Sequence, residues 1–143
     1  MGIKQLSVFI ENHAGTVGRL TNVLDTVGIQ IRGFSLADTV DYGIARIVVD
    51  KPQAAQEALE QAGFLVRLSD VLCIELPDTP GALGHVFTAV AKAGVDVQYA
   101  YSLVSTYVVL KVDDVRLAEG QLEGQPLRFV GQEELALPVV RGW

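Results

Sequence analysis

The chain has 143 residues, of which 50% are hydrophobic and 20% charged, a composition typical of a globular protein and not of a disordered one. Eleven basic residues against 17 acidic ones give a net charge of −6 without any basic stripe, which disfavours nucleic-acid binding. The single cysteine, Cys73, excludes a disulfide framework or a zinc cluster within one chain. With no signal-peptide pattern and no apolar run of transmembrane length, the sequence predicts a cytoplasmic protein without membrane contact.

The first half of the chain predicts six elements in the order β-α-β-β-α-β. Alternating apolar residues predict a strand at Leu6–Ile10. Apolar residues three or four positions apart predict a helix with Val17, Leu20, Leu24 and Val27 on one face. Asp50 is of the type that forms an N-cap for a second helix, with Pro52 in its first turn. The other predicted strands of this half are Ile29–Leu36, Gly43–Val49 and Phe64–Leu68.

The second half repeats the first. Three glycines return 66 positions later: Gly15, Gly18 and Gly28 as Gly81, Gly84 and Gly94. Apolar spacing predicts a helix with Leu83, Val86, Val90 and Ala93 on one face, and either Asp113 or Asp114 predicts the start of another. The predicted strands of this half are Leu72–Leu76, Val95–Leu103, Tyr107–Val112 and Leu127–Val130.

The repeat indicates two related modules, residues 1–69 and 70–143, joined only by Ser69 and Asp70. A β-α-β-β-α-β order normally gives a four-stranded antiparallel sheet with both helices on one face. The predicted fold is therefore α+β, with two ferredoxin-like modules. A further strand is predicted at Glu134–Val140, which could pair with the first module's sheet or with another chain.

The turns before the first helix of each module are the candidate chemical sites. In the second turn, Thr79 suits an N-cap, Pro80 suits the first helical position, and Gly81 lets another group approach the backbone. Free backbone N–H groups at a helix N-terminus can bind a small carboxylate, and Asn12 or Asp78 beside them could hold an ammonium group. The alternative is that these residues merely begin a helix.

Both turns resemble a known family. The run Asp78-Thr-Pro-Gly-Ala-Leu83, an amphipathic helix and Ala93-Gly-Val-Asp-Val97 are similar to the signature of the ACT domain, a small regulatory module that binds amino acids. The first module has the same frame from Asn12 to Val17 and from Val27 to Ile31. The run Arg32–Asp38 further resembles stand-alone tandem ACT proteins, which carry no catalytic domain.

The resemblance implies that an effector amino acid lies where two modules meet, between the turn of one module and the second strand of the other. The ligand-binding residues that it implies are Asn12, His13, Ala14, Gly15, Thr16, Val17, Ile29, Gln30, Ile31, Asp78, Thr79, Pro80, Gly81, Ala82, Leu83, Val95, Asp96, Val97 and Gln98, with Arg32 at the end of one strand segment. A ligand that touches both modules stabilises one mutual arrangement, which is regulation and not catalysis.

Other conspicuous residues carry weaker alternatives. His13 and His85 lack a second metal ligand at a suitable spacing, so a structural role is favoured over acid–base or metal chemistry. Tyr99 and Tyr101 suit packing or, as the minority alternative, contact with a ligand ring. An exposed strand position is favoured for Arg32 over a pair with a ligand carboxylate.

The sequence therefore predicts a homodimeric, non-catalytic protein that binds a free amino acid and needs no cofactor or metal. The alternative is an interaction or dimerisation module that binds no ligand and docks on a metabolic enzyme. An enzyme is disfavoured because no nucleophile–base pair and no phosphate-binding loop of the GxxxxGK type is present.

Overall fold

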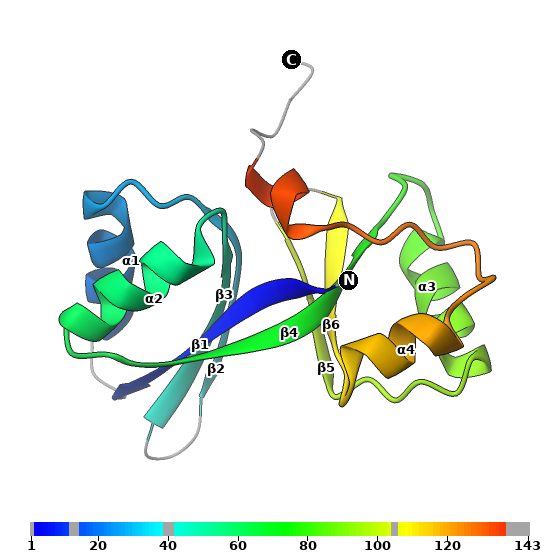
Figure 1. Ribbon diagram of the computed structural model, residues 1–143, viewed down its shortest axis with the longest axis horizontal. Helices are drawn as coiled ribbons and strands as arrows, with labels where there is room; N and C mark the ends of the chain where they lie inside the picture. The colour runs from blue at the N-terminus through cyan, green and yellow to red at the C-terminus, as the bar shows by residue number, and fades with distance from the viewer. Residues whose placement is uncertain (1, 12–14, 39–41, 104–105, 137–143) are drawn as a thin grey trace. The chain divides into compact units, whose positions relative to one another are not determined.

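The computed structural model describes residues 2–11, 15–38, 42–103 and 106–136 (Figure 1). It separates into two compact units: the first is Lys4–Ser69 with the residues from Leu135 onward, and the second is Asp70–Glu134 with the residues before Lys4. Within the described ranges, the strands and helices in chain order are β1 (Ile3–Glu11), α1 (Thr16–Thr26), β2 (Ile31–Asp38), β3 (Tyr42–Val49), α2 (Pro52–Gln61), β4 (Leu65–Glu75), α3 (Ala82–Lys92), β5 (Tyr99–Ser102), β6 (Tyr107–Lys111) and α4 (Val115–Gln121), followed by a short 3₁₀ helix at Gln132–Ala136.

The first unit is a β-sheet with two helices on one face. Its strands follow the order β2-β3-β1-β4, and β3 pairs antiparallel with both β1 and β2. Figure 1 shows α1 and α2 on the same side of this sheet. Alternate residues of the strands and the apolar faces of both helices form one core, in which these side chains are fully buried: Leu6, Val8, Leu20, Leu24, Ile47 and Leu59. Each such side chain contributes about 1.5–3 kcal/mol by leaving water, so this face fixes the register of the strands.

The second unit repeats the plan with shorter elements. Strand β6 pairs antiparallel with β4 and with β5, and α3 and α4 supply the helical layer. Its core is formed by the following buried side chains: Leu72, Ile74, Val86, Val90, Leu110 and Leu122. The two units confirm the predicted α+β class, with antiparallel sheets and ferredoxin-like modules.

Strand β4 corrects one prediction. The predicted strands Phe64–Leu68 and Leu72–Leu76 form one continuous strand, Leu65–Glu75. Ser69 and Asp70 therefore do not form a separate link, because neither is a glycine or proline that would interrupt a strand.

The segment Leu127–Val130 was predicted as a strand and is not one. It runs beside β4 through a single bridge, Ile74 to Phe129. The N–H of Glu75 donates to the carbonyl of Arg128 at 3.0 Å, and the N–H of Val130 donates to the carbonyl of Cys73 at 2.8 Å. It thus occupies the position of a strand without the regular ladder, and the N–H of Leu127 donates locally to the carbonyl of Gln125 at 2.8 Å.

The predicted strand at Glu134–Val140 is also wrong in its described part. Residues Gln132–Ala136 form a 3₁₀ helix, and 137–140 lie outside the described residues. The carbonyl of Leu135 accepts a hydrogen bond from Arg32 Nε at 2.8 Å within the first unit. Arg32 is half-buried, so the expectation of an exposed strand arginine needs the same correction.

The second helix of the first unit does not have the predicted cap. Its N-cap is Lys51, and the carboxylate of Asp50 instead accepts from the N–H of Gln30 at 3.0 Å. In the second unit Asp114 is the N-cap of α4, where its carboxylate accepts from the N–H of Leu117 at 3.1 Å.

Candidate functional site

The glycine before the first helix of each module has the same backbone conformation in both predicted turns. Gly15 precedes α1 with a φ of 88°, and Gly81 precedes α3 with a φ of 86°. Four residues on, the N–H of Arg19 donates to the carbonyl of Gly15 and that of His85 to the carbonyl of Gly81, each at 2.9 Å. The left-handed region is open to glycine and costs other residues about 1–2 kcal/mol. The repeat therefore conserves a turn geometry as well as a spacing within this chain.

The N-cap prediction for Thr79 is wrong. Helix α3 begins at Ala82, after Gly81, and Pro80 lies in the turn before it. The N–H of Thr79 donates to the carbonyl of Pro77 at 2.8 Å, and the N–H of Ala82 to the carbonyl of Thr79 at 3.3 Å. These local bonds complete a tight turn, so the chain reverses at Gly81 and the helix starts two residues later than predicted.

A pocket opens beneath the first turn. Its volume is about 540 Å³, which is within the range of small-molecule sites. It lies at the ends of β1, β3 and β4 and at the start of α1. The side chains that define its character are Phe9, Glu11, Thr16, Arg19, Tyr42 and Phe64.

Arg19 is held in this pocket by two contacts. Its guanidinium carbon lies 4.1 Å from the centre of the Phe64 ring, and its Nη1 donates to the carbonyl of Ala62 at 3.0 Å. A cation over an aromatic face is attracted by the ring electrons. The guanidinium is thereby positioned while most of its five N–H donors are not engaged by Ala62.

A second pocket opens beneath the second turn, with a volume of about 330 Å³. Thr79, Pro80, Gly81 and Ala82 line it, which are four of the predicted site residues. The repeat offset of 66 places His85 where the first pocket has Arg19, and Pro77 where it has Glu11. The two pockets are thus equivalent in position and different in charge.

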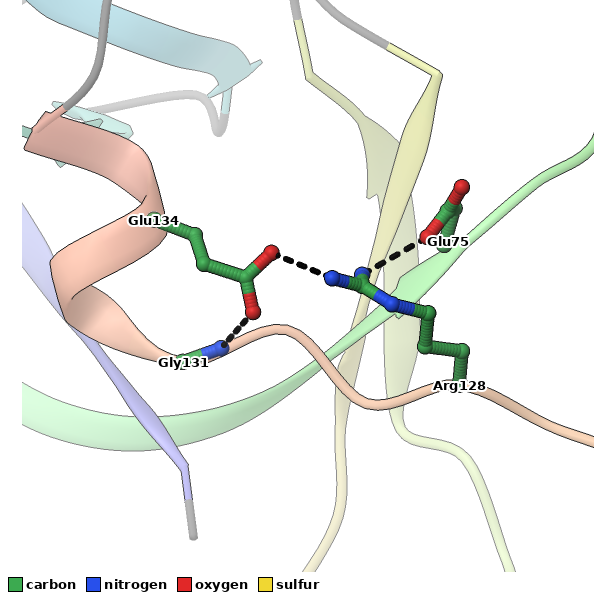
Figure 2. Close-up of polar contacts among 4 residues, drawn as sticks. All are labelled: Glu75, Arg128, Gly131 and Glu134. Atoms are coloured by element: carbon green, nitrogen blue, oxygen red, sulfur yellow. Dashed lines mark hydrogen bonds and ion pairs between the residues drawn. The ribbon is translucent and has the colours of Figure 1, made fainter.

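Glu75 in the second pocket belongs to a charged cluster (Figure 2). Arg128 Nη1 lies 2.6 Å from Glu75 Oε2, and Arg128 Nη2 lies 2.7 Å from Glu134 Oε2. The hydrogen bond from Arg128 lowers the pKa of Glu134, and the same bond raises the pKa of Arg128. The cluster fastens the segment after Pro126 to β4, so Glu75 is already paired.

The predicted strand residues do not join the turn pockets of their own units. Val95 and Asp96 line a separate pocket of about 190 Å³ with Asp113 and Asp114. Gln98 precedes β5 and its amide donates to the carboxylate of Asp113. Val97 packs against the core of the second unit.

The strand segment of the first repeat behaves similarly. Ile29 is buried in the core, and Ile31 packs against it at the start of β2. Gln30 is exposed, and its backbone groups pair with Asp50. None of these three residues lines the pocket beneath the first turn.

The remaining predicted site residues divide into three sets. Asn12, His13 and Ala14 lie outside the described residues. Thr16 lines the first pocket, and Val17 packs against the core of the first unit. Asp78 and Leu83 are exposed, and neither lines the second pocket.

Sequence reasoning missed most of the first pocket. Arg19, Glu11 and Phe9 were not among the predicted site residues, although each has a counterpart in the second pocket at the repeat offset. Comparison of the two repeats position by position could have found them. The repeat does not identify Tyr42 or Phe64 as pocket residues. The pairing of β1 with β3 brings Tyr42 to the pocket, and the end of α2 brings Phe64.

Cys73 shows no sign of reactive chemistry. Burial, and secondarily the charge of Glu134, raises the pKa of its thiol to about 12, so the nucleophilic thiolate is scarce at neutral pH. Among the described residues, no three His, Cys, Asp or Glu side chains gather as a metal site requires.

A family model for the ACT domain pair matches residues 1–138. The chain belongs to the ACT domain pair family. No curated protein matches the sequence. Across the described ranges, no helix is long and apolar enough to cross a membrane.

Solved structures agree with this assignment. Protein BT0572 from Bacteroides thetaiotaomicron is 31% identical, with a TM-score of 0.87, over 95% of this chain and 96% of that one. The ligand-free regulatory subunit of aspartate kinase from Thermus thermophilus is 20% identical, with a TM-score of 0.62, over 85% of this chain and 88% of that one. The corresponding subunit from Thermus flavus is 21% identical, with a TM-score of 0.60, over 85% and 89%. The two Thermus subunits show that the fold is shared.

Proposed function

We propose that this ACT domain pair is a non-catalytic regulatory protein that binds a free amino acid. The observation that carries the proposal is the pair of matched turns, each with a left-handed glycine and each opening onto a pocket. No side chain caps the first N–H groups of α1 or α3. Uncapped N–H groups at a helix N-terminus can donate hydrogen bonds to a carboxylate.

The proposal keeps the predicted composite site. The turn of one module supplies the carboxylate contacts, and a second-strand segment of another module, such as Ile29–Arg32 or Val95–Gln98, closes the site. That arrangement explains why these segments line no turn pocket of their own unit. Ligand binding would then change the free energy of one module arrangement relative to another.

We propose a second molecule of the same chain as the partner. Strand β2 is the last strand in the order, so one of its edges has no neighbouring strand among the described residues. Phe34 and Leu36 point to one face of β2 and are 40% and 48% exposed. Two β2 strands paired antiparallel about Ser35 place Phe34 of each molecule opposite Leu36 of the other, which buries both.

The same edge favours a second candidate function, a module that dimerises or docks on a metabolic enzyme and binds no ligand. Exposed strand edges pair with other chains whether or not a pocket nearby is occupied. The two functions differ in one measurable respect, the response to free amino acids.

The test is thermal unfolding of the protein with each of the twenty amino acids at millimolar concentration. A ligand at 100 times its dissociation constant stabilises the folded state by about 2.7 kcal/mol, which visibly raises the melting temperature. Matched compounds without an amino group, such as isocaproate for leucine, control for nonspecific effects. If no amino acid raises the melting temperature, the docking function replaces the sensor function.

A further inference from the structure

Residues 126–131, which we call the strap, occupy the fourth-strand position of the second module. In the first module the same position is held by a regular strand, the first half of β4. Among the described residues, the strap has only the bridge from Phe129 to Ile74 and two backbone hydrogen bonds to β4, donated by Glu75 and Val130. With so few ladder bonds, side-chain contacts become a large part of what holds the strap in place.

Arg128 supplies the polar part of these contacts (Figure 2). Its Nη1 lies 2.6 Å from Glu75 Oε2 on β4, and its Nη2 lies 2.7 Å from Glu134 Oε2 in the 3₁₀ helix. Glu134 Oε1 in turn accepts from the N–H of Gly131 at 3.5 Å. One guanidinium thus fastens the middle of the strap both to β4 and to the 3₁₀ helix that follows.

The charged side chains of this cluster remain in contact with water. Arg128 is 55% exposed, Glu75 is 40% exposed and Glu134 is 30% exposed. Exposed ion pairs stabilise a structure weakly, and dissolved salt screens them. Leu127 and Phe129, on either side of Arg128, pack instead against the core of the second unit. The strap is therefore held on one face by apolar packing and on the other by charges that ionic strength weakens.

The first repeat has an apolar pair in place of this ion pair. The offset of 66 aligns Phe9 with Glu75. The second repeat is about three residues shorter between its second and third strands, so from there on the offset is 63 and Leu65 aligns with Arg128. Salt does not screen contacts between apolar side chains. The charged fastening is therefore a property of the second module alone.

The strap also forms one wall of the pocket beneath the second turn. Pro126 and Leu127, at the start of the strap, line this pocket of about 330 Å³ together with Gly81 and Ala82 of the turn. A displacement of the strap from β4 would move Leu127 away from the turn and change the width of the pocket.

We propose that Arg128 is a latch, whose ion pairs with Glu75 and Glu134 hold the strap on β4, and that release of the latch opens the second pocket. This inference goes beyond the proposed function, because it holds whichever ligand the protein binds and also if it binds none. It predicts that opening depends on ionic strength.

Amide hydrogen exchange followed by NMR on the intact chain tests the latch. The reporters are the N–H groups of Glu75 and Val130, which bond across the strap, and the references are those of Gln98 and Leu103, which bond to β6. Between about 10 mM and about 1 M sodium chloride the screening length falls from about 30 Å to about 3 Å. We expect the strap amides to exchange at least about threefold faster at high salt, with the reference amides unchanged.

Three variants identify the cause of the salt response. Arg128→Met should give fast exchange of the strap amides at every salt concentration. Glu133→Gln, the matched control, removes an exposed carboxylate from the same 3₁₀ helix, keeps both ion pairs and should keep the natural salt response. Glu75→Phe combined with Arg128→Leu copies the pair of the first repeat and should restore slow exchange without any dependence on salt.

The backbone resonances of Gly81 and Ala82 report on the pocket, and we expect them to shift with salt in the natural protein and not in Arg128→Met. Equal exchange of the strap amides in the natural protein and in Arg128→Met would overturn the latch. Acceleration of the reference amides to the same extent would also overturn it, since the whole unit would then be unfolding. If the strap amides respond to salt and Gly81 and Ala82 do not, the latch does not control the pocket and the proposal fails.

Discussion

Replacement of Gly81 by alanine should destabilise the protein, whereas the same change three residues later should stabilise it. Gly81 has a φ of 86°, and a Cβ added there would meet no atom within 4 Å. The whole cost is therefore backbone strain, about 1–2 kcal/mol for an L-residue in the left-handed region. A lower entropy of the unfolded chain offsets about 0.4–1 kcal/mol of this cost. We expect a net loss of about 1 kcal/mol.

Gly84 is the matched control. It lies inside α3 at a negative φ, and a Cβ there also meets no atom within 4 Å. Alanine stabilises a helix interior by about 0.5–1 kcal/mol relative to glycine. Gly81→Ala and Gly84→Ala should therefore differ by about 1.5–2 kcal/mol, with opposite signs relative to the natural protein.

Urea unfolding followed by circular dichroism measures both changes, with the transition midpoint as the readout. The equivalent pair in the first repeat, Gly15→Ala and Gly18→Ala, should behave alike because Gly15 has a φ of 88° and Gly18 lies inside α1. If Gly81→Ala and Gly84→Ala shift the midpoint in the same direction, the left-handed turn is not the origin of the effect and the reasoning is refuted.

Three further predictions concern other parts of the molecule. Phe34→Lys should shift the proposed dimer to monomer in analytical ultracentrifugation, whereas Leu117→Lys, a change at a residue that is 62% exposed in the second unit, should not; an unchanged dimer, or a natural protein that is a monomer, would exclude the β2 edge. The thiol of Cys73, with its pKa raised to about 12, should react with Ellman's reagent at pH 8 only after denaturation, and rapid labelling of the native protein would contradict its burial. The lowered pKa of Glu134 means that its stabilising effect is present above the ordinary glutamate pKa and is lost as the pH falls through the folded value. Unfolding curves of Glu134→Gln and the natural protein should therefore differ at pH 6 and converge as the pH falls below the folded pKa of Glu134; a constant difference would show that the charge of Glu134 plays no part.

The fold could be predicted from the sequence because its signals are local and occur twice. Apolar spacing located α1 and α3, since an amphipathic face has to be buried, but the turn residues placed the start of α3 at Pro80, two residues too early. The continuity of β4 could not be predicted in this way. Each repeat has its own strand pattern at that point. Ser69 and Asp70 allow the two patterns to merge because neither is a glycine or proline, but only pairing with the neighbouring strands makes them merge.

The turn glycines of the candidate site could be predicted from the sequence, whereas the side chains that line the pocket could not. The repeat identifies Gly15 and Gly81 by their positions in the sequence. Their φ angles are properties of the folded turn, and they set the helix starts at Thr16 and Ala82. Tyr42 reaches the first pocket because it pairs with Glu11 across two strands. Such register is a long-range property that a local reading of residues 10–20 does not contain.

The difference between the pockets shows which part of a repeated motif carries specificity. Both turns place a glycine and a helix start in the same way, so the turn alone attracts any small anion equally well in either repeat. Selection among ligands has to come from side chains that differ, and these are Arg19 against His85 and Glu11 against Pro77. A motif match therefore locates both candidate turns, whereas the side chains around them have to be compared one by one.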